Sequence, residues 1–176
     1  MLVRRAVLIS FLVLVFFAPT AAHAQLEFPQ PIGWVNDFAK IISANTKQRL
    51  TAVCVELDQK TNAQIAVVTI DTIGATPIGD YAHLLFNKWG IGHKEDNRGM
   101  LILLSRADHT YYIAVGRGFE SLFPNDRVAG IGAKMASYLR RRDFDRALLH
   151  AVDEIANIVA NERKITLKTV PPPSAP

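Results

Sequence analysis

Residues 89–120 read WGIGHKEDNRGMLILLSRADHTYYIAVGRGFE, and this stretch decides the fold. A polar loop over 92–98 runs into an apolar segment, and a polar turn separates that segment from a second apolar one. A loop of sequence GRGFE closes the stretch at 116–120. Two strands paired through the turn at 107–109 run antiparallel, so both loops should lie at the same end of a sheet.

The two loops carry side chains that suit a hard cation. Asp96 and Asn97 offer a carboxylate and an amide carbonyl side by side, and Glu120 offers a carboxylate in the second loop. Calcium accepts such oxygen ligands, whereas zinc favours nitrogen and sulfur. We therefore predict a calcium site with Asp96, Asn97 and Glu120 as ligands. Asp37, in a loop before the first predicted helix, is a further candidate ligand.

Each candidate ligand also has an ordinary structural alternative. Asp37 could cap a helix or turn, because a short carboxylate readily accepts nearby backbone hydrogen bonds. Asp96 and Asn97 could form a solvated turn between a helix and a strand. Glu120 could form a short salt bridge with Arg117. The sequence leaves these alternatives open.

Candidate catalytic groups are few. Arg117 could hold an anionic substrate group, but the spacing of its glycines matches neither a P-loop nor a dinucleotide fingerprint. Asp143 and Asp145 resemble part of an aspartyl-phosphatase motif, yet they follow an arginine run instead of a strand, which favours helix capping. Ser105 lacks His and Asp partners at a recognisable spacing, and His93 is the histidine that lies beside the candidate loop.

The first 24 residues have the pattern of a secretory signal peptide. Arg4 and Arg5 precede a mostly apolar run over 6–18, and Ala-His-Ala at 22–24 resembles a cleavage site. The apolar run, at roughly 13 residues, is shorter than the about 20 that a membrane-spanning helix needs. We expect cleavage of the signal peptide after residue 24, which would give a periplasmic or secreted protein. The alternative is an N-terminal membrane anchor.

Charge and cysteine content limit the partners. The chain has 20 Lys and Arg against 16 Asp and Glu, and two of the arginines belong to the predicted signal, so nothing indicates nucleic-acid binding. The dense basic run 140–142 is predicted to end a helix, where cations complement the helix dipole. Its alternative is a patch for anionic lipid or phosphate. The single cysteine, Cys54, lies on an apolar stripe, and no disulfide-linked partner is expected.

The hydrophobic periodicity predicts an α/β fold. Helices and strands alternate early in the chain and two helices close it, so a small mixed sheet with helices on both faces, a three-layer α/β/α sandwich, would bury the apolar strands. Residues 25–32 are predicted to form an extended leader, and 163–176 a disordered proline-rich tail. Helices are predicted over 44–60 and 80–89 and from Asp126 and Asp143, and strands over 64–70, 100–104 and 111–115.

Several short motifs, in order, resemble the TPM-domain family, whose members include plant thylakoid-lumen phosphatase-like proteins and bacterial envelope proteins. The resemblance covers roughly residues 33–160, within a predicted domain of 33–162. Arg98 is a departure, because many relatives have glycine directly after the Asp-Asn pair. The matching pieces are Val35-Asn36-Asp37-Phe38-Ala39 with Ser43, Ile65 to Thr69, Trp89-Gly90-Ile91-Gly92, Asp96-Asn97-x-Gly99 with Leu101 to Leu104, Gly116-x-Gly118-Phe119-Glu120 and Arg142-Asp143-Phe144.

The resemblance implies a compact α/β/α sandwich that is exported, often membrane-linked and often calcium-binding. Acid phosphatase activity is attributed to plant relatives, and roles in photosystem repair and receptor modulation to others. The expected function is therefore an exported calcium-binding module that assists the maintenance or regulation of a membrane-protein assembly. The alternative is a metal-assisted acid phosphatase of low turnover that hydrolyses phosphomonoesters.

Overall fold

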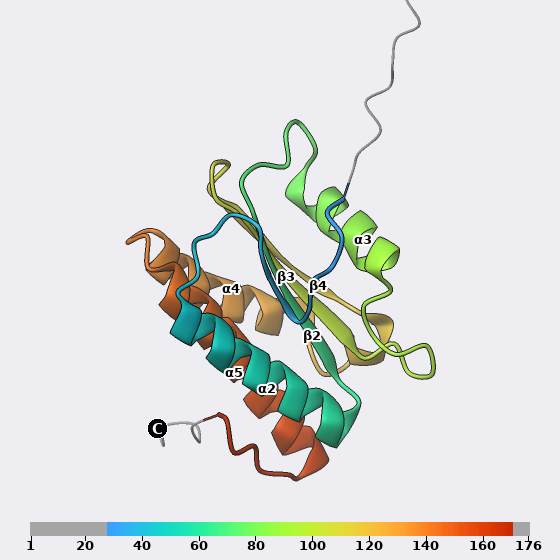
Figure 1. Cartoon of the computed structure of the whole chain (residues 1–176). Coiled ribbons are helices and arrows are strands. Elements are labelled where there is room, and N and C mark those ends of the chain that lie inside the picture. The colour runs from blue at the N-terminus through green and yellow to red at the C-terminus, as the bar shows by residue number, and fades with distance from the viewer. Residues whose placement is uncertain (1–27, 171–176) are drawn as a thin grey trace, which may run out of the picture.

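The computed structural model describes residues 28–170, so the predicted signal at 1–24 lies outside the described part. A four-stranded sheet of order β1-β2-β3-β4 forms its centre (Figure 1). β1, β2 and β3 run parallel, and β4 runs antiparallel to β3, so the sheet is mixed as predicted. The strands are β1 (Val35–Asp37), β2 (Gln64–Ile70), β3 (Gly99–Ser105) and β4 (Thr110–Val115).

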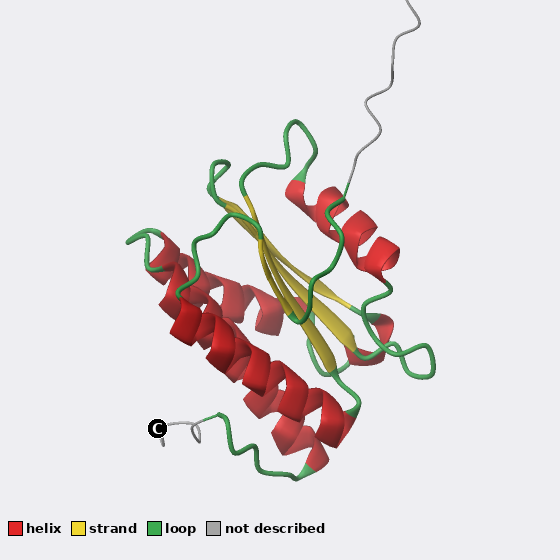
Figure 2. Ribbon diagram, viewed as in Figure 1, coloured by secondary structure: helices red, strands yellow, loops and turns green. Residues whose placement is uncertain are grey.

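Helices cover both faces of this sheet (Figure 2). α2, α4 and α5 pack on one face and α3 on the other, which confirms the three-layer α/β/α arrangement. None of the described helices is both long and apolar enough to cross a lipid bilayer. The helices are α2 (Ala44–Thr61), α3 (Ile78–Trp89), α4 (Asn125–Leu139) and α5 (Phe144–Arg163), with a short 3-10 turn, η1 (Arg117–Phe119), after β4.

The central strand β3 is buried along its whole length because it contributes to two cores. Met100 and Ile102 face the core under α2 and α5, whereas Leu101 and Leu103 face the core under α3. This alternation follows from the two-residue period of a strand. A strand covered on both faces therefore has the continuous apolar sequence that predicted it.

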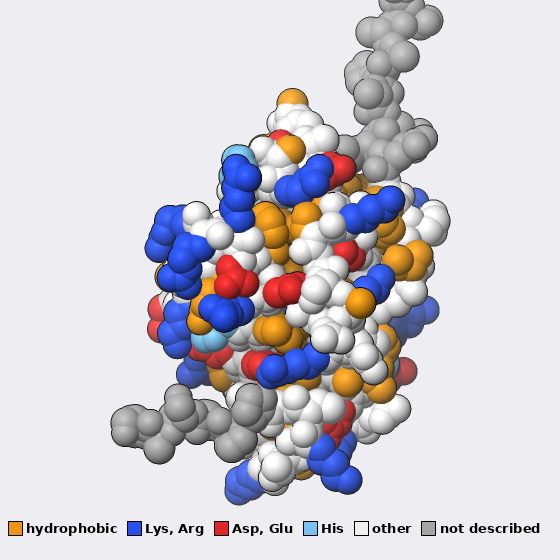
Figure 3. Space-filling view, turned by 60° about the vertical axis from the view of Figure 1, so that its left-hand side comes forward, with side chains coloured by type: hydrophobic (Ala, Val, Ile, Leu, Met, Phe, Trp, Pro, Cys, Tyr) orange, Lys and Arg blue, Asp and Glu red, His pale blue; other side chains and the backbone are white. Residues whose placement is uncertain are grey.

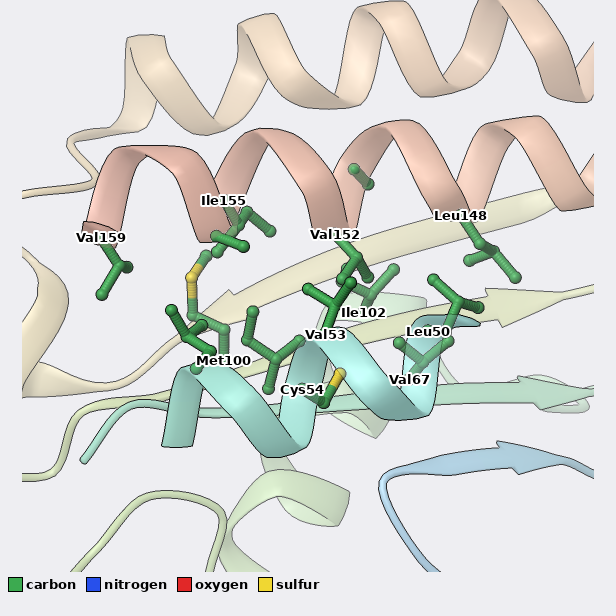
Figure 4. Packing of buried hydrophobic residues seen from close by; sticks show 14 of the residues in the cluster. Leu50, Val53, Cys54, Val67, Met100, Ile102, Leu148, Val152, Ile155 and Val159 are labelled. Carbon is green, nitrogen blue, oxygen red and sulfur yellow. The ribbon is translucent and has the colours of Figure 1, made fainter. Parts of the chain in front are cut away.

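The larger core lies between the sheet, α2 and α5 (Figure 4). Cys54 is 0% exposed within it, among side chains such as Val53 and Val152. Burial raises the pKa of the Cys54 thiol to about 12. The thiol is therefore not a nucleophile at neutral pH, which agrees with the position of Cys54 on an apolar stripe of the sequence.

The sequence did not predict β1. This strand has three residues, and its central Asn36 is fully buried, which apolar patterning does not reveal. The Asn36 side chain accepts a hydrogen bond from the Ile32 amide at 2.7 Å and donates one to the Gly33 carbonyl at 2.8 Å. These bonds compensate the buried amide. Pairing with β2, which no local pattern encodes, makes the segment a strand.

Two helices begin earlier than predicted. α3 begins at Ile78 instead of Asp80, and α4 at Asn125 instead of Asp126. A proline, Pro77 or Pro124, occupies the N-cap position of each, where a missing N–H costs no hydrogen bond. The acidic residues lie within the first turn and complement the helix dipole.

Part of the predicted disordered tail is packed. α5 continues to Arg163, and residues 165–170 fold back along α2, where Leu167 is 5% and Val170 is 6% exposed. The Glu56 carboxylate accepts hydrogen bonds from the Lys168 amide at 2.8 Å and the Thr169 amide at 2.9 Å. The prediction of disorder from 163 is therefore wrong as far as residue 170, because a distant carboxylate satisfies this backbone.

The Glu56 carboxylate should hold this segment in place. Burial opposes ionisation, but the hydrogen bonds from Lys168, Lys60 and Thr169 lower the pKa of Glu56 to about 2. Because the folded-state pKa is depressed, this contribution to stability is complete above the unfolded pKa and is lost as pH falls through about 2. Glu56→Gln should speed hydrogen exchange of the Lys168 and Thr169 amides about tenfold, since one amide would face an NH2 group. Unchanged exchange would contradict this role, and Glu95→Gln is the control.

Candidate functional site

The two candidate loops meet at the open end of the β3–β4 hairpin. The hairpin register pairs Met100 with Val115 and Ser105 with Thr110, which confirms the predicted pairing. The Gly118 amide donates a hydrogen bond to the Asn97 carbonyl at 3.2 Å. A Cβ on Gly118 would lie 2.0 Å from the Asp96 carbonyl oxygen, so only glycine allows this approach.

Asp96 and Asn97 form the tip of the first loop. The Asp96 carboxylate accepts a hydrogen bond from the Arg98 amide at 3.2 Å through Oδ1 and another from the Asn62 side chain at 3.2 Å through Oδ2. Asn97 is exposed and has a positive φ of 53°, a conformation that Asn tolerates better than most residues. No cationic side chain pairs with Asp96 within residues 28–170.

Three carboxylates lie near His93, in a loop that also contains Lys94 and Arg98. His93 Nε2 lies 2.6 Å from Asp58 Oδ1. The hydrogen bond to Asp58 raises the pKa of His93, and the charges of Asp58, Asp96 and Glu95 raise it further against the opposing effect of burial. Three carboxylates therefore act on one imidazole at this end of the sheet.

Asp37 makes the hydrogen bonds expected of the turn-cap alternative. Its carboxylate accepts hydrogen bonds from the Ile41 and Ile42 amides, each at 3.1 Å, and from the Thr69 hydroxyl at 2.5 Å. These contacts close the loop that joins β1 to α2. The turn-cap alternative therefore describes Asp37 in this structure.

Asp37 also lies at the opposite end of the sheet from the two candidate loops. Through the parallel registers it is level with Thr69 of β2 and Leu104 of β3. Asp96 precedes Gly99, the first residue of β3, so the separation along the strands is about 17 Å. A single cation cannot bind both carboxylates, and the structure does not bring Asp37 to the predicted site.

Arg117, the first residue of η1, and Glu120, which follows η1, are both exposed. Neither forms an ion pair among the described residues, so the predicted alternative of a salt bridge between them does not occur there. Glu120 lines a hollow beside β4 and the start of α4. Between residues 28 and 170, no group of three or more His, Cys, Asp or Glu side chains is arranged to hold a metal ion.

Arg98 is the residue whose importance the sequence did not reveal. It is 8% exposed, and its guanidinium donates to both carboxylate oxygens of Glu162, at 2.8 and 3.3 Å. The hydrogen bond from Arg98 lowers the pKa of Glu162. The guanidinium also lies 4.6 Å from the ring centre of Phe119. Arg98, the residue that departs from the family pattern, therefore connects the 92–98 and 116–120 loops to the end of α5. In the sequence, this departure was the one sign that Arg98 matters.

The fold places this chain in a class of small α/β/α domains that bacterial proteins of known structure share. The N-terminal domain of a P. gingivalis protein matches with a TM-score of 0.70 and 21% identity, covering 75% of this chain and 85% of that chain. BA42 from Bizionia argentinensis matches with a TM-score of 0.61 and 16% identity, covering 68% and 82%. The N-terminal domain of cg2496 from Corynebacterium glutamicum matches with a TM-score of 0.58 and 12% identity, covering 75% and 85%.

The family assignment comes from the sequence itself. The family model described as the TPM domain matches residues 35–158, and the chain belongs to the TPM-domain family. No curated protein matches the sequence. The resemblance seen in the short motifs is therefore confirmed at the level of the family and of the fold.

Proposed function

We propose that this TPM domain is an exported calcium-binding module that docks on a membrane-protein assembly. The observation that carries the calcium proposal is the group of three carboxylates around His93. Asp58, Glu95 and Asp96 all act on His93 there, and Asp96 has no cationic partner among the described residues. A cation bound at this loop would relieve the repulsion among these carboxylates.

The residues at this loop fit a shallow calcium site in which water supplies part of the coordination, and they do not fit a site made of protein ligands alone. The Asp96 carboxylate and the Asn97 side-chain amide are the ligands kept from the sequence prediction. Asn62 adds a third oxygen if its amide turns, because its oxygen and nitrogen are interchangeable by a flip. Water would complete the shell, as calcium permits. With so few charged ligands, the expected affinity is that of extracellular modules, about 10⁻⁴–10⁻³ M. Glu120 would join only by turning toward this loop.

The test is the melting temperature of the purified protein with chelator, with calcium and with magnesium at millimolar concentration. A ligand that binds only the folded state stabilises it by about 1.4 kcal/mol at ten times its Kd. Calcium should therefore raise the melting temperature by about 3–5 °C. Magnesium should do less, because it needs a near-octahedral site.

Asp96→Asn is the decisive variant for this measurement. It removes the charge but keeps an oxygen that accepts the Arg98 amide, so the turn should survive. Asp126→Asn is the matched control, because it removes the same charge from the exposed first turn of α4. The calcium shift should disappear in Asp96→Asn and persist in Asp126→Asn. An equal shift in both variants, or none in the wild-type protein, would refute the site.

The docking part of the proposal rests on the roles that the family resemblance implies. Its test is binding to solubilised envelope membrane proteins, compared between calcium and chelator and between the wild-type protein and Asp96→Asn. A partner retained by the wild-type protein only with calcium would support the proposal. Identical partners in chelator would count against a role for calcium in docking.

One observation favours the phosphatase alternative. Arg117 is exposed, lies in the loop beside Asp96 and has no ion-pair partner in the described part of the chain, so it is free to bind a phosphoryl group. The nearby chemistry is less favourable. Ser105 is buried and donates its hydrogen bond to Asp108 at 2.5 Å, and Cys54 has a raised pKa. Hydrolysis would need a metal-activated water. Activity toward an aryl phosphate that Asp96→Asn and Arg117→Gln both abolish would establish this alternative.

A further inference from the structure

A pocket lies at the end of the sheet opposite to the 93–98 loop. It is a half-open hollow lined by the β3–β4 turn, the end of α4, the α4–α5 turn and Ile41, and its volume is about 770 Å³. This volume is in the range of small-molecule sites, about 300–1,000 Å³. It lies beyond the carboxyl end of β3, the usual position of ligands in open sheets of parallel strands. Figure 1 shows both turns on the same side of the molecule.

The pocket combines an apolar floor with a cationic rim. Figure 3 shows apolar surface in a hollow between Lys and Arg side chains on this side of the protein. Arg106, His109, Arg140 and Arg142 contribute the basic groups, and no carboxylate lines the pocket in the described structure. The apolar lining consists mainly of Ile41, Leu104, Tyr111, Ala136, Leu139 and Phe144.

Two of the arginines are available to a ligand. Arg106 is already paired with Asp71 at 2.7 Å. Arg140 and Arg142 are exposed and have no ion-pair or hydrogen-bond partner for their guanidinium groups in the described chain. Arg141, which lies between them, has its guanidinium 5.2 Å from the ring centre of Tyr138 and does not line the pocket.

The carboxylates near the pocket accept hydrogen bonds from other groups of the protein. Asp108 accepts hydrogen bonds from the Ser105 hydroxyl and the Ile73 amide. Asp143 caps α5 by accepting the Arg146 amide, and Asp145 accepts the Ser43 amide. The predicted capping role is thus confirmed for Asp143, whereas Asp145 lies in the first turn of α5 and binds Ser43. Neither acid forms an ion pair with Arg140 or Arg142 in the described structure.

Two residues of the rim have a left-handed backbone conformation, as do four other non-glycine residues of the described chain. His109 has a φ of 54° and Arg142 a φ of 57°, a region in which glycine is the favoured residue. Both turns nevertheless carry long basic or aromatic side chains that line the pocket. The Thr110 hydroxyl, also part of the lining, is buried without a hydrogen-bond partner in the described structure. The unpaired Thr110 hydroxyl is the feature that points to a polar ligand group, because buried polar groups are normally hydrogen-bonded.

We propose that this pocket binds an amphipathic anion, an alkyl or aryl group that carries a carboxylate or phosphate. Its apolar part would lie against Leu139, Phe144 and Tyr111. Arg140 and Arg142 would hold the headgroup, because guanidinium groups match the oxygens of carboxylate and phosphate. The site is independent of the proposed calcium site, which lies at the other end of β3.

The test is binding of decyl phosphate and decanoate, below their micelle concentrations, followed by calorimetry and by the NMR shifts of Leu139 and Phe144. Inorganic phosphate and decyltrimethylammonium are the control ligands. The anionic amphiphiles should bind, whereas phosphate alone should bind at least about tenfold more weakly and the cationic amphiphile not at all. Equal binding of the cationic amphiphile would overturn the proposal.

Three variants make the test specific. Arg140→Gln combined with Arg142→Gln should weaken binding of decyl phosphate at least about tenfold. Arg141→Gln removes the same charge next to the pocket and should bind like the wild-type protein. Ala136→Leu narrows the apolar part of the pocket and should weaken binding while every charge remains. Equal affinities in the double variant and in Arg141→Gln would refute the headgroup role, whatever the Ala136 variant does.

Further measurements distinguish a membrane lipid from a soluble amphiphile as the ligand. Vesicles of phosphatidylglycerol, compared with phosphatidylcholine, test a lipid headgroup in a membrane. Retention on anionic vesicles that the double arginine variant loses would identify a membrane lipid, whereas binding of free decyl phosphate only would identify a soluble amphiphile. Asp96→Asn should bind decyl phosphate normally, so the result does not depend on the calcium site. Absence of binding in every arm would overturn the proposal.

Discussion

Ile155→Asp is expected to abolish the cooperative fold. Ile155 is 0% exposed on the inner face of α5, in the core that this helix shares with α2 and β3 (Figure 4). A carboxylate there would have no cationic or hydrogen-bonding partner within this apolar cluster. The expected loss exceeds about 4 kcal/mol, a large part of the about 5–15 kcal/mol by which domains are stable. Thermal unfolding followed by circular dichroism would measure it.

Two controls separate the buried charge from the change of side chain. Ile155→Val leaves the core apolar and should cost only about 0.5–1.5 kcal/mol. Asn161→Asp places a carboxylate on the same helix at an exposed position and should cost less than about 1 kcal/mol, the size of an unfavourable helix-dipole interaction. If Ile155→Asp melted at the wild-type temperature, the inward orientation of this face of α5 would be wrong.

The elements with strong local patterns were predictable. The 3.6-residue period of 143–159 gave the buried face of α5, and the strand predicted over Gln64–Ile70 matches β2 at both ends. The polar turn between two apolar runs gave the hairpin and thereby the meeting of the two candidate loops. In each case the information lies within one element or between neighbours in the sequence.

The features that were missed depend on pairing between distant segments. The direction of β1, and hence the end of the sheet at which Asp37 lies, is set by parallel pairing with β2. The packing of 165–170 depends on Glu56, more than a hundred residues earlier in the chain. From the sequence, Arg98 is an ordinary loop arginine, because its partner Glu162 lies 64 residues later in the chain. Sequence periodicity contains no information on which distant segments pair. The candidate calcium ligands could therefore be proposed from the sequence, but the sequence could not show that Asp37 lies far from Asp96 and Asn97.

Gly118→Ala should destabilise the protein by about 1–3 kcal/mol or more, because the added Cβ would lie 2.0 Å from the Asp96 carbonyl oxygen and 3.0 Å from the Asn97 carbonyl carbon. Both contacts are to backbone, so a side-chain rotation cannot relieve them. Gly118 has no left-handed φ, so the cost measures this contact and not the backbone conformation. The loops at 92–98 and 116–120 should separate, and the calcium response should weaken with them. Chemical denaturation and the calcium-dependent melting shift would measure both effects.

Gly130→Ala is the matched control for this substitution. Gly130 lies in the exposed interior of α4, and a Cβ there would have no neighbour within 4 Å. Alanine should stabilise the helix by about 0.5–1 kcal/mol, since it loses less backbone entropy on folding. The same chemical change should therefore have opposite signs at two glycines. If Gly118→Ala were as harmless as Gly130→Ala, the two loops would not be in backbone contact, and the calcium site proposed beside them would lose the rigid support of the second loop.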